Sequence, residues 1–323
     1  MLGRALLPRL DDQLLQALCD VVQGQSQAQA EATAATAATD ARHGVASCSS
    51  CCVTIEGVDL AQSALEDFIN SYYIFHNLNP DSTHDVLKYS PFLGFMESHI
   101  YDLDQANEDC LHPEMAEMAH GVMRHVDAVE DPFGPLRQVL EERTWMTPEL
   151  DSEFQQGARF WALERQICRA LGSKSSVKSF TQEEAEEALR LKSFDYRAMN
   201  LLLYKMRGEK PCKEHMDFLA TSEILVEIGD DLVDYYEDME RNSFNIYRCF
   251  VALHGDSAQT ELRRYISAAE EAYAAAFSAL QRLDEPLAAK WLQRNQASKR
   301  HNCGSEKPGG ATWEIPPAVQ EMR

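Results

Sequence analysis

From residue 53 onward, apolar and polar positions follow the period of an α-helix. Apolar residues recur three and four positions apart, and this spacing gathers them on one face of a helix. The sequence has no convincing run of Val, Ile and Thr with the period of two that a half-buried strand shows. The pattern therefore predicts an all-α domain.

Prolines divide this pattern, because a proline cannot continue a helix that precedes it. They stand in the gaps at Pro80, Pro113, Pro148 and Pro211. Thr181 followed by Glu184 has the form of a capping box, which predicts that a helix begins there. We expect helices near residues 59–77, 83–110, 113–130, 134–146, 148–171, 181–207, 211–254, 257–283 and 285–295.

The two ends of the chain differ from the helical part. Residues 24–43 are rich in Ala, Gln and Thr and contain almost nothing large enough to pack, so we expect residues 1–52 to be disordered or weakly structured. Residues 296–323 contain Gly and Pro pairs and predict an irregular tail. No repeat of 20 to 50 residues is visible, which favours one helical domain over residues 53–295 rather than a solenoid.

The net negative charge of the chain disfavours some classes of binding partner. The chain has 323 residues, with 52 Asp and Glu against 30 Lys and Arg, and a net charge of -22. A protein so acidic is not expected to bind nucleic acid or anionic membranes. No apolar run reaches the roughly 20 residues of a membrane span.

The cysteines and the N-terminal sequence indicate in which cellular compartment the protein is expected. The nine cysteines lack the spacing of a disulfide framework, which favours a reducing environment. The N-terminus is rich in Leu and has early Arg residues, but transit peptides are poor in acids, and Asp11 and Asp12 lie within it. We therefore expect a cytoplasmic protein, with a plastid as the alternative.

One segment concentrates negative charge. Residues 223–240 contain eight carboxylates and no Lys or Arg, although carboxylates four apart on a helix repel by roughly 0.2–0.5 kcal/mol per pair. At 100° per residue, a stripe roughly 80° wide is formed by Glu223, Glu227, Asp230, Asp234 and Asp238. Such a stripe is either a solvated helix face or a site for a hard cation. Magnesium suits it, because this ion takes one or two carboxylates and completes its shell with water and phosphate oxygens.

The sequence "DDLVDYYEDMERNSFNIY" resembles the second metal-binding segment of the class I isoprenoid synthases. Asp230, Asp234 and Asp238 occupy the i, i+4 and i+8 positions at which terpene synthases carry metal ligands, and the all-Asp form is closer to squalene and phytoene synthases. Arg241 stands where terpene synthases often have a basic residue that contacts diphosphate. The chain looks most like isoprenoid-synthase-like proteins of plants and algae.

The resemblance implies a single helical bundle or barrel around a central cavity, with a second acidic motif on a facing helix. The candidate is "HIYDLDQANED", in which Asp104 and Glu108 stand four apart, 126 residues before Asp230. Arg197, Tyr204 and Arg207 are further candidates for binding the diphosphate, which favours donors such as Arg.

On this hypothesis, the protein is a magnesium-dependent lyase or prenyl transferase that ionises a prenyl diphosphate. Asp230, Asp234 and Asp238 are its catalytic metal ligands, joined by Asp104 and Glu108. Aromatic side chains can stabilise a carbocation, and the expected cavity lining includes Phe92, Phe95, Tyr101, Leu201, Tyr204 and Tyr235.

Two alternatives remain open at this point. The first acidic motif departs from the usual DDxxD, so the chain is alternatively a non-catalytic helical relative that binds a prenyl lipid or a protein partner. Glu117 and His120 form one Glu-x-x-His pair, whereas a di-iron bundle requires two such pairs.

The substitution Asp234→Asn distinguishes a metal site from a solvated face. Without metal, removing one charge from a repulsive row should stabilise the protein by a few tenths of a kcal/mol. With millimolar magnesium and a diphosphate-bearing ligand the sign should reverse, because a lost anionic ligand weakens the binding that stabilises the folded state. Thermal melting under both conditions measures this. A variant at least as stable as the wild type in both would indicate a solvated face.

Overall fold

The computed structural model describes residues 51–111, 131–173, 179–302 and 313–319. The chain divides into two units, residues 1–50 and 51–323, and the described residues all belong to the second unit. Within them every regular element is a helix, which confirms the all-α prediction. None of these helices combines the length and the apolar character that crossing a membrane requires. The expected N-terminal segment lies outside the described residues except for Cys51 and Cys52.

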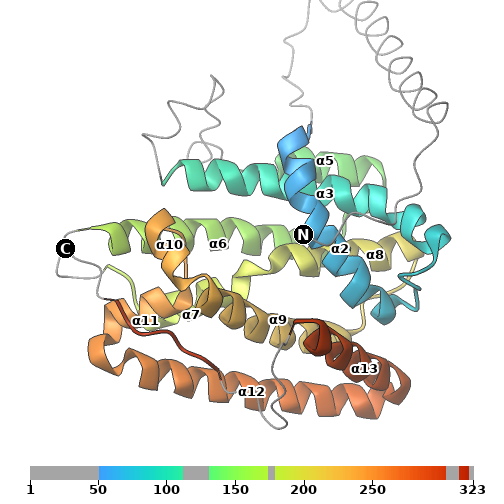
Figure 1. Ribbon diagram of the computed structural model, residues 1–323. Coiled ribbons are helices and arrows are strands. Elements are labelled where there is room, and N and C mark those ends of the chain that lie inside the picture. The colour runs from blue at the N-terminus through green and yellow to red at the C-terminus, as the bar shows by residue number, and fades with distance from the viewer. Residues whose placement is uncertain (1–50, 112–130, 174–178, 303–312, 320–323) are drawn as a thin grey trace, which may run out of the picture. The chain divides into compact units, whose positions relative to one another are not determined.

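The helices are named in chain order as in Figure 1. They are α2 (Ile55–Tyr72), the 3-10 helix η1 (Tyr73–His76), α3 (Thr83–Asp109), α5 (Gly134–Glu142), α6 (Pro148–Gly172), α7 (Gln182–Lys192), α8 (Phe194–Arg207), α9 (Lys213–Val233), α10 (Tyr235–Arg241), α11 (Ile246–His254), the 3-10 helix η3 (Gly255–Ser257), α12 (Ala258–Leu283) and α13 (Glu285–Asn302).

The long helices of the second unit lie in successive layers (Figure 1). Helix α3 contacts α8 and α6, α8 contacts α9, and α9 packs along α12. Helix α2 pairs with α3, while α7 and α11 contact α6 and α9. The helices that carry the two acidic segments, α3 and α9, therefore lie on opposite sides of the layer that α6 and α8 form.

Three of the expected helices need comment. The expected helix at 181–207 begins with the predicted capping box, in which Thr181 and Glu184 bond reciprocally, but it is broken at Ser193 into α7 and α8. The expected helix at 211–254 is broken at Asp234 and again between Arg241 and Ile246. The helix expected at 113–130 lies outside the described residues.

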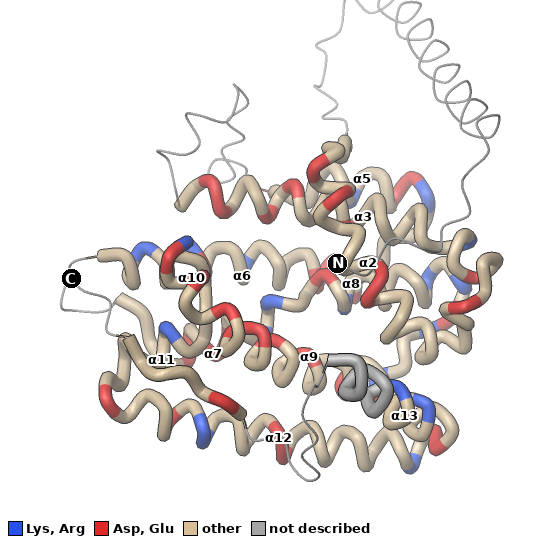
Figure 2. Tube along the Cα trace, viewed as in Figure 1, with Lys and Arg blue, Asp and Glu red and all other residues tan. Residues whose placement is uncertain are grey.

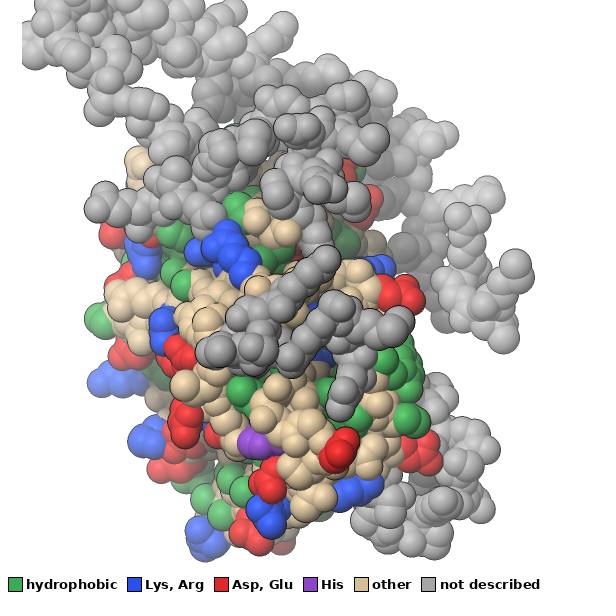
Figure 3. Space-filling view, turned by 90° about the vertical axis from the view of Figure 1, so that its left-hand side faces the viewer, with side chains coloured by type: hydrophobic (Ala, Val, Ile, Leu, Met, Phe, Trp, Pro, Cys, Tyr) green, Lys and Arg blue, Asp and Glu red, His purple; other side chains and the backbone are tan. Residues whose placement is uncertain are grey.

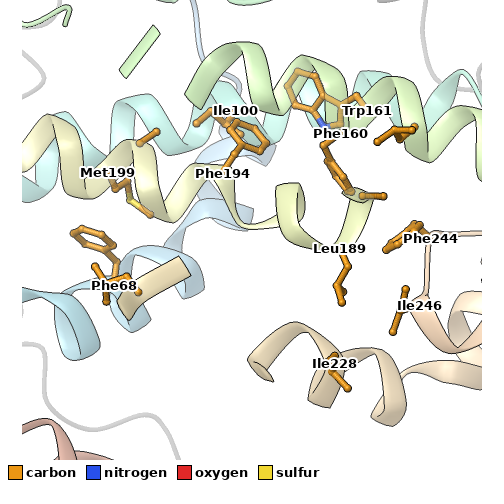
Figure 4. Close-up of a cluster of buried hydrophobic side chains, with 14 of the residues drawn as sticks. Phe68, Ile100, Phe160, Trp161, Leu189, Phe194, Met199, Ile228, Phe244 and Ile246 are labelled. Carbon is orange, nitrogen blue, oxygen red and sulfur yellow. The ribbon is translucent and has the colours of Figure 1, made fainter. Parts of the chain in front are cut away.

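Aromatic packing fixes the centre of this unit. Phe133 stacks on Phe154 and on Trp161, with ring centroids 4.8 and 5.1 Å apart, and Phe194 meets Phe133 and Trp161 edge-on. Figure 4 shows Phe194 and Trp161 within the buried cluster. The ring of Phe194 lies directly over Gly157 of α6, where a Cβ would be only 2.4 Å from it. Helices α6 and α8 can therefore approach closely at this point.

A buried cation also joins three helices. Arg197 on α8 is 6% exposed, and its guanidinium donates to Glu153 of α6 at 2.9 Å and to Glu223 of α9 at 2.7 Å. A buried charge is tolerated only when it is paired and hydrogen-bonded. This arrangement therefore requires α6, α8 and α9 to keep a fixed spacing.

The tail expected from residue 296 begins later, because α13 continues to Asn302; residues 313–319 have no regular structure, but they are held against the helices. The Tyr247 hydroxyl donates to the Pro316 carbonyl at 3.0 Å, and the indole of Trp313 donates to Glu270 at 2.9 Å. The Tyr235 hydroxyl donates to the Val319 carbonyl at 3.3 Å and accepts from the Val319 N–H at 3.1 Å. The segment therefore links α10, α11 and α12.

Gly157→Ala should be destabilising, because the added methyl group would push the enclosed Phe194 ring out of place. Overpacking of this kind costs roughly 1–3 kcal/mol. Urea unfolding of the variant and the wild type measures the free-energy difference.

Gly229→Ala in the interior of α9 is the matched control. A Cβ there would meet Trp313 at 3.7 Å, an ordinary contact, so the better helix propensity of Ala should stabilise this variant by about 0.5–1 kcal/mol. Equal effects of the two substitutions would contradict the packing argument.

Candidate active site

A cavity of about 320 Å³ lies among α3, α6, α7, α8, α9 and α10. Its wall contains nine carboxylates but only two cationic side chains, Lys192 and Arg241. The acids are Asp104, Glu108, Glu164, Asp195, Glu227, Asp230, Asp231, Asp234 and Asp238, and the apolar and aromatic wall consists of Ile100, Tyr101, Phe160, Phe194, Tyr196 and Phe244. The two acidic segments singled out in the sequence thus border the same space.

The first acidic segment is positioned by α6. The indole N–H of Trp161 donates to Asp104 Oδ1 at 2.7 Å, so this carboxylate is fixed on the cavity side of α3. One turn further, Asn107 donates to Glu164 at 2.6 Å. Glu108 follows on the same side of α3 and borders the cavity.

The second acidic segment spans a break in the helix. Asp230 is on α9, Asp234 is the single residue between α9 and α10, and Asp238 is on α10. The i to i+4 hydrogen bonds continue across the break, with both N···O distances 2.9 Å. Asn245 donates to Asp238 Oδ2 at 2.9 Å. The three carboxylates therefore stay on one side although the helix is not continuous, and Figure 2 shows this acidic run along α9 and α10.

Basic residues from neighbouring elements pair with the other acids of this segment on α9, which are Glu223, Glu227 and Asp231. Glu223 pairs with Arg197, and both Glu227 and Asp231 pair with Lys192 at 2.8 Å. The three motif acids, Asp230, Asp234 and Asp238, form no ion pair within the described part of the chain. The acidic row therefore consists of two sets, one of carboxylates that form ion pairs and one of carboxylates that border the cavity without an ion pair among the described residues.

Lys192 was not expected from the sequence. It is the last residue of α7, its side chain is 28% exposed, and it borders the cavity between Glu227 and Asp231. Burial alone would lower its pKa, but the two carboxylates outweigh burial and raise it. Lys192 therefore stays charged in the cavity wall.

Burial raises the pKa of most of the cavity acids. It raises the pKa of Glu108 to about 7, with Asp104 and Asp109 adding to the effect, and that of Asp230 to about 6, with Glu227 adding. The pKa values of Asp104 and Asp238 are raised in the same direction, again mainly by burial. A divalent cation would reverse these shifts, because it stabilises the ionised form of each carboxylate.

Three of the residues expected to bind diphosphate lie elsewhere. Arg197 is occupied by Glu153 and Glu223, because a buried guanidinium needs such partners. Arg207, near the far end of α8, pairs with Glu209, and the Tyr204 hydroxyl bonds to His215. None of the three borders the cavity.

Arg241 does border the cavity, as its position after Asp238 suggested. Its side chain is 70% exposed and pairs with Glu237. Of the residues expected to line an apolar cavity, only Tyr101 does so. The others pack elsewhere, Phe92 for example against Trp145. The Glu117 and His120 pair lies outside the described residues.

The donor set determines what the cavity can hold. Its free carboxylates are oxygen ligands of the kind that magnesium prefers, although no three His, Cys, Asp or Glu among the described residues are already gathered into a metal-binding group. The face shown in Figure 3 carries basic and acidic side chains interspersed where described residues are visible.

Comparisons with protein-family models, with curated proteins and with solved structures find no match for this chain. A functional conclusion therefore rests on the geometry and chemistry of the cavity.

The raised pKa of Glu108 predicts how stability depends on pH without metal. The folded state holds the proton of Glu108 up to about pH 7, whereas an unfolded Glu loses it near pH 4.3. The contribution of Glu108 to the free energy of unfolding is therefore fully present below about pH 4 and is lost as the pH rises through 7. After allowance for partial exposure, the loss should be on the order of 2 kcal/mol.

Glu108→Gln in chelator should reduce the fall in unfolding free energy between pH 5 and pH 8 by that amount. Glu141→Gln, on the exposed part of α5, is the control and should leave the wild-type slope unchanged. The comparison is made between variants, because His76, whose pKa burial lowers to about 4, acts in the opposite direction. Equal slopes for all three proteins would show that Glu108 is not desolvated.

Proposed function

We propose that this chain binds magnesium in the cavity and ionises an allylic prenyl diphosphate, in the manner of the class I isoprenoid synthases. One observation carries the proposal. Two acidic segments 126 residues apart border one cavity that also has an aromatic wall. A solvated helix face would not need a second acidic helix opposite it.

The residues present fit the metal. Asp230, Asp234 and Asp238 on one side, with Asp104 and Glu108 on α3, are the carboxylates that would hold it. When bound, magnesium would neutralise these acids and stabilise the charge that develops on the departing diphosphate.

Two cations in the wall suit the diphosphate itself. Glu227 and Asp231 hold the ammonium group of Lys192 in place. An N–H of this group that neither carboxylate accepts would remain for a phosphate oxygen. Arg241 is mostly exposed and tied only to Glu237 on its own helix, so little is lost when it turns to a phosphate oxygen. Both would strengthen their contacts as the leaving group gains charge.

The remaining wall suits the hydrocarbon chain. Phe160, Phe194 and Phe244 border the cavity, as do Tyr101 and Tyr196. Aromatic rings stabilise a nearby positive charge through their faces, and an apolar wall keeps water away from a reactive carbocation. The acidic and aromatic parts of the cavity would therefore serve the two ends of one substrate.

The test is release of diphosphate from dimethylallyl, geranyl, farnesyl and geranylgeranyl diphosphates in the presence of magnesium. The wild type should release it from at least one of the four substrates, and Asp230→Asn and Asp104→Asn should each reduce release by roughly a hundredfold or more, as when one group that stabilises developing charge is removed.

Glu240→Gln is the matched control, because Glu240 is an exposed acid on α10 that does not border the cavity. It should retain wild-type release. No release from any of the four substrates would refute the enzyme. Saturable binding without release would instead support a non-catalytic protein that binds a prenyl lipid.

A further inference from the structure

Two carboxyl groups from different helices meet beside the cavity. Glu97 of α3 is fully buried, and among the described residues no N–H or O–H group donates to either of its oxygens. Asp195 of α8 borders the cavity, and its Oδ1 is likewise shielded and without a donor. The two side chains are within hydrogen-bonding range of each other. Two carboxylates cannot both be ionised at this range away from water, so the pair shares one proton.

The surroundings indicate which member holds the proton. Tyr101 and Asp104 of α3, Tyr196 and Arg197 of α8, and Glu227 of α9 face the pair. Burial raises the pKa of both acids, well above the usual range for Glu97 and to about 6 for Asp195. Asp195 is also partly exposed, whereas Glu97 is fully buried, and contact with water favours the ionised form. Glu97 is therefore the protonated member and donates to an ionised Asp195.

Asp195 lies within the aromatic part of the cavity wall. Its two neighbours in sequence, Phe194 and Tyr196, both belong to the aromatic wall of the cavity. Asp195 is thus an anionic oxygen group placed within the part of the wall that would surround a carbocation. No ion pair neutralises it within the described ranges, since nearby Arg197 is bonded to Glu153 and Glu223.

We propose that Asp195 is the base that ends the reaction, with Glu97 as the residue that positions it. This inference rests on the proposed function. After diphosphate departs, the C–H bond next to the cationic carbon breaks, and its electron pair forms the new C=C bond. The proton passes to the Asp195 carboxylate, and the pair, now holding two protons, returns one to water. The product is therefore an alkene rather than an alcohol.

The test compares the products and the diphosphate release of wild type and variants with geranyl diphosphate. Asp195→Asn should keep release within about threefold of the wild type, while the ratio of alkene to alcohol falls at least tenfold because water captures the cation. Asp195→Glu should restore the alkene. Glu97→Gln still offers a donor to Asp195 and should retain most of the alkene.

The infrared spectrum supplies a readout that does not depend on activity. The wild type at neutral pH should show the C=O stretch of a buried protonated carboxylic acid. Other buried acids such as Glu108 contribute to this band, so difference spectra isolate Glu97: the band should appear in the wild-type minus Glu97→Gln spectrum and should be missing from the wild-type minus Asp195→Asn spectrum. Its absence from the first difference spectrum would overturn the shared proton and the base role that depends on it.

The outcomes separate the two proposals. A wild type that releases no diphosphate overturns the proposed function together with the base. Wild-type release with an unchanged alkene fraction in Asp195→Asn overturns the base role alone. Loss of release in both Asp195→Asn and Asp195→Glu would assign Asp195 to folding or to diphosphate departure and would also overturn it.

Discussion

Two cations at the junction of α7 and α8 hold the acidic helix α9 in place. Arg197 bonds to Glu223, and Lys192, five residues earlier, bonds to Glu227 and Asp231. Removing one partner of a buried ion pair costs about 3–5 kcal/mol, because the other charge is left desolvated. The position of α9 relative to α6, α7 and α8, and with it the cavity, depends on these pairs.

The same pairs divide the carboxylates of the second acidic segment into two groups. Glu223, Glu227 and Asp231 pair with Arg197 and Lys192, whereas Asp230 and Asp234 border the cavity without an ion pair in the described part of the chain. Packing thus leaves only some of these acids without a cationic partner. Burial raises the pKa of the unpaired Asp230 to about 6, and a bound metal would offset this shift.

The sequence predicted the helices well, because their boundaries are marked by prolines, caps and apolar periodicity. It also predicted that the segments of Asp104 and Asp230 belong to one site, although only through resemblance, since spacing along the chain does not fix which helices face each other. Arg197 was assigned to diphosphate because nothing in the sequence shows that Glu153 and Glu223 surround it. Tertiary contacts of this kind have no local signature.

The break at Ser193 had a signal that was overlooked. In "RLKSFD" the basic residues Arg190 and Lys192 suit the end of one helix, and Ser193 followed by Asp195 suits the start of the next. A continuous helix was expected because the apolar period runs through this point. The six residues 192–197 contain both cations that hold α9 and the acid that borders the aromatic wall, so the missed break concealed the centre of the site.

The contact between Tyr235 and Val319 has a consequence for the order in which the chain is completed. These residues are 84 positions apart, and a contact of such separation must overcome a large loop-closure entropy. During synthesis α9 and α10 emerge well before residue 319, and domains begin to fold as they emerge. The side of the site formed by α10 would then be secured only after most of the bundle has assembled. A chain that ends shortly before residue 313 would contain every described helix but would lack the last support of its second acidic segment.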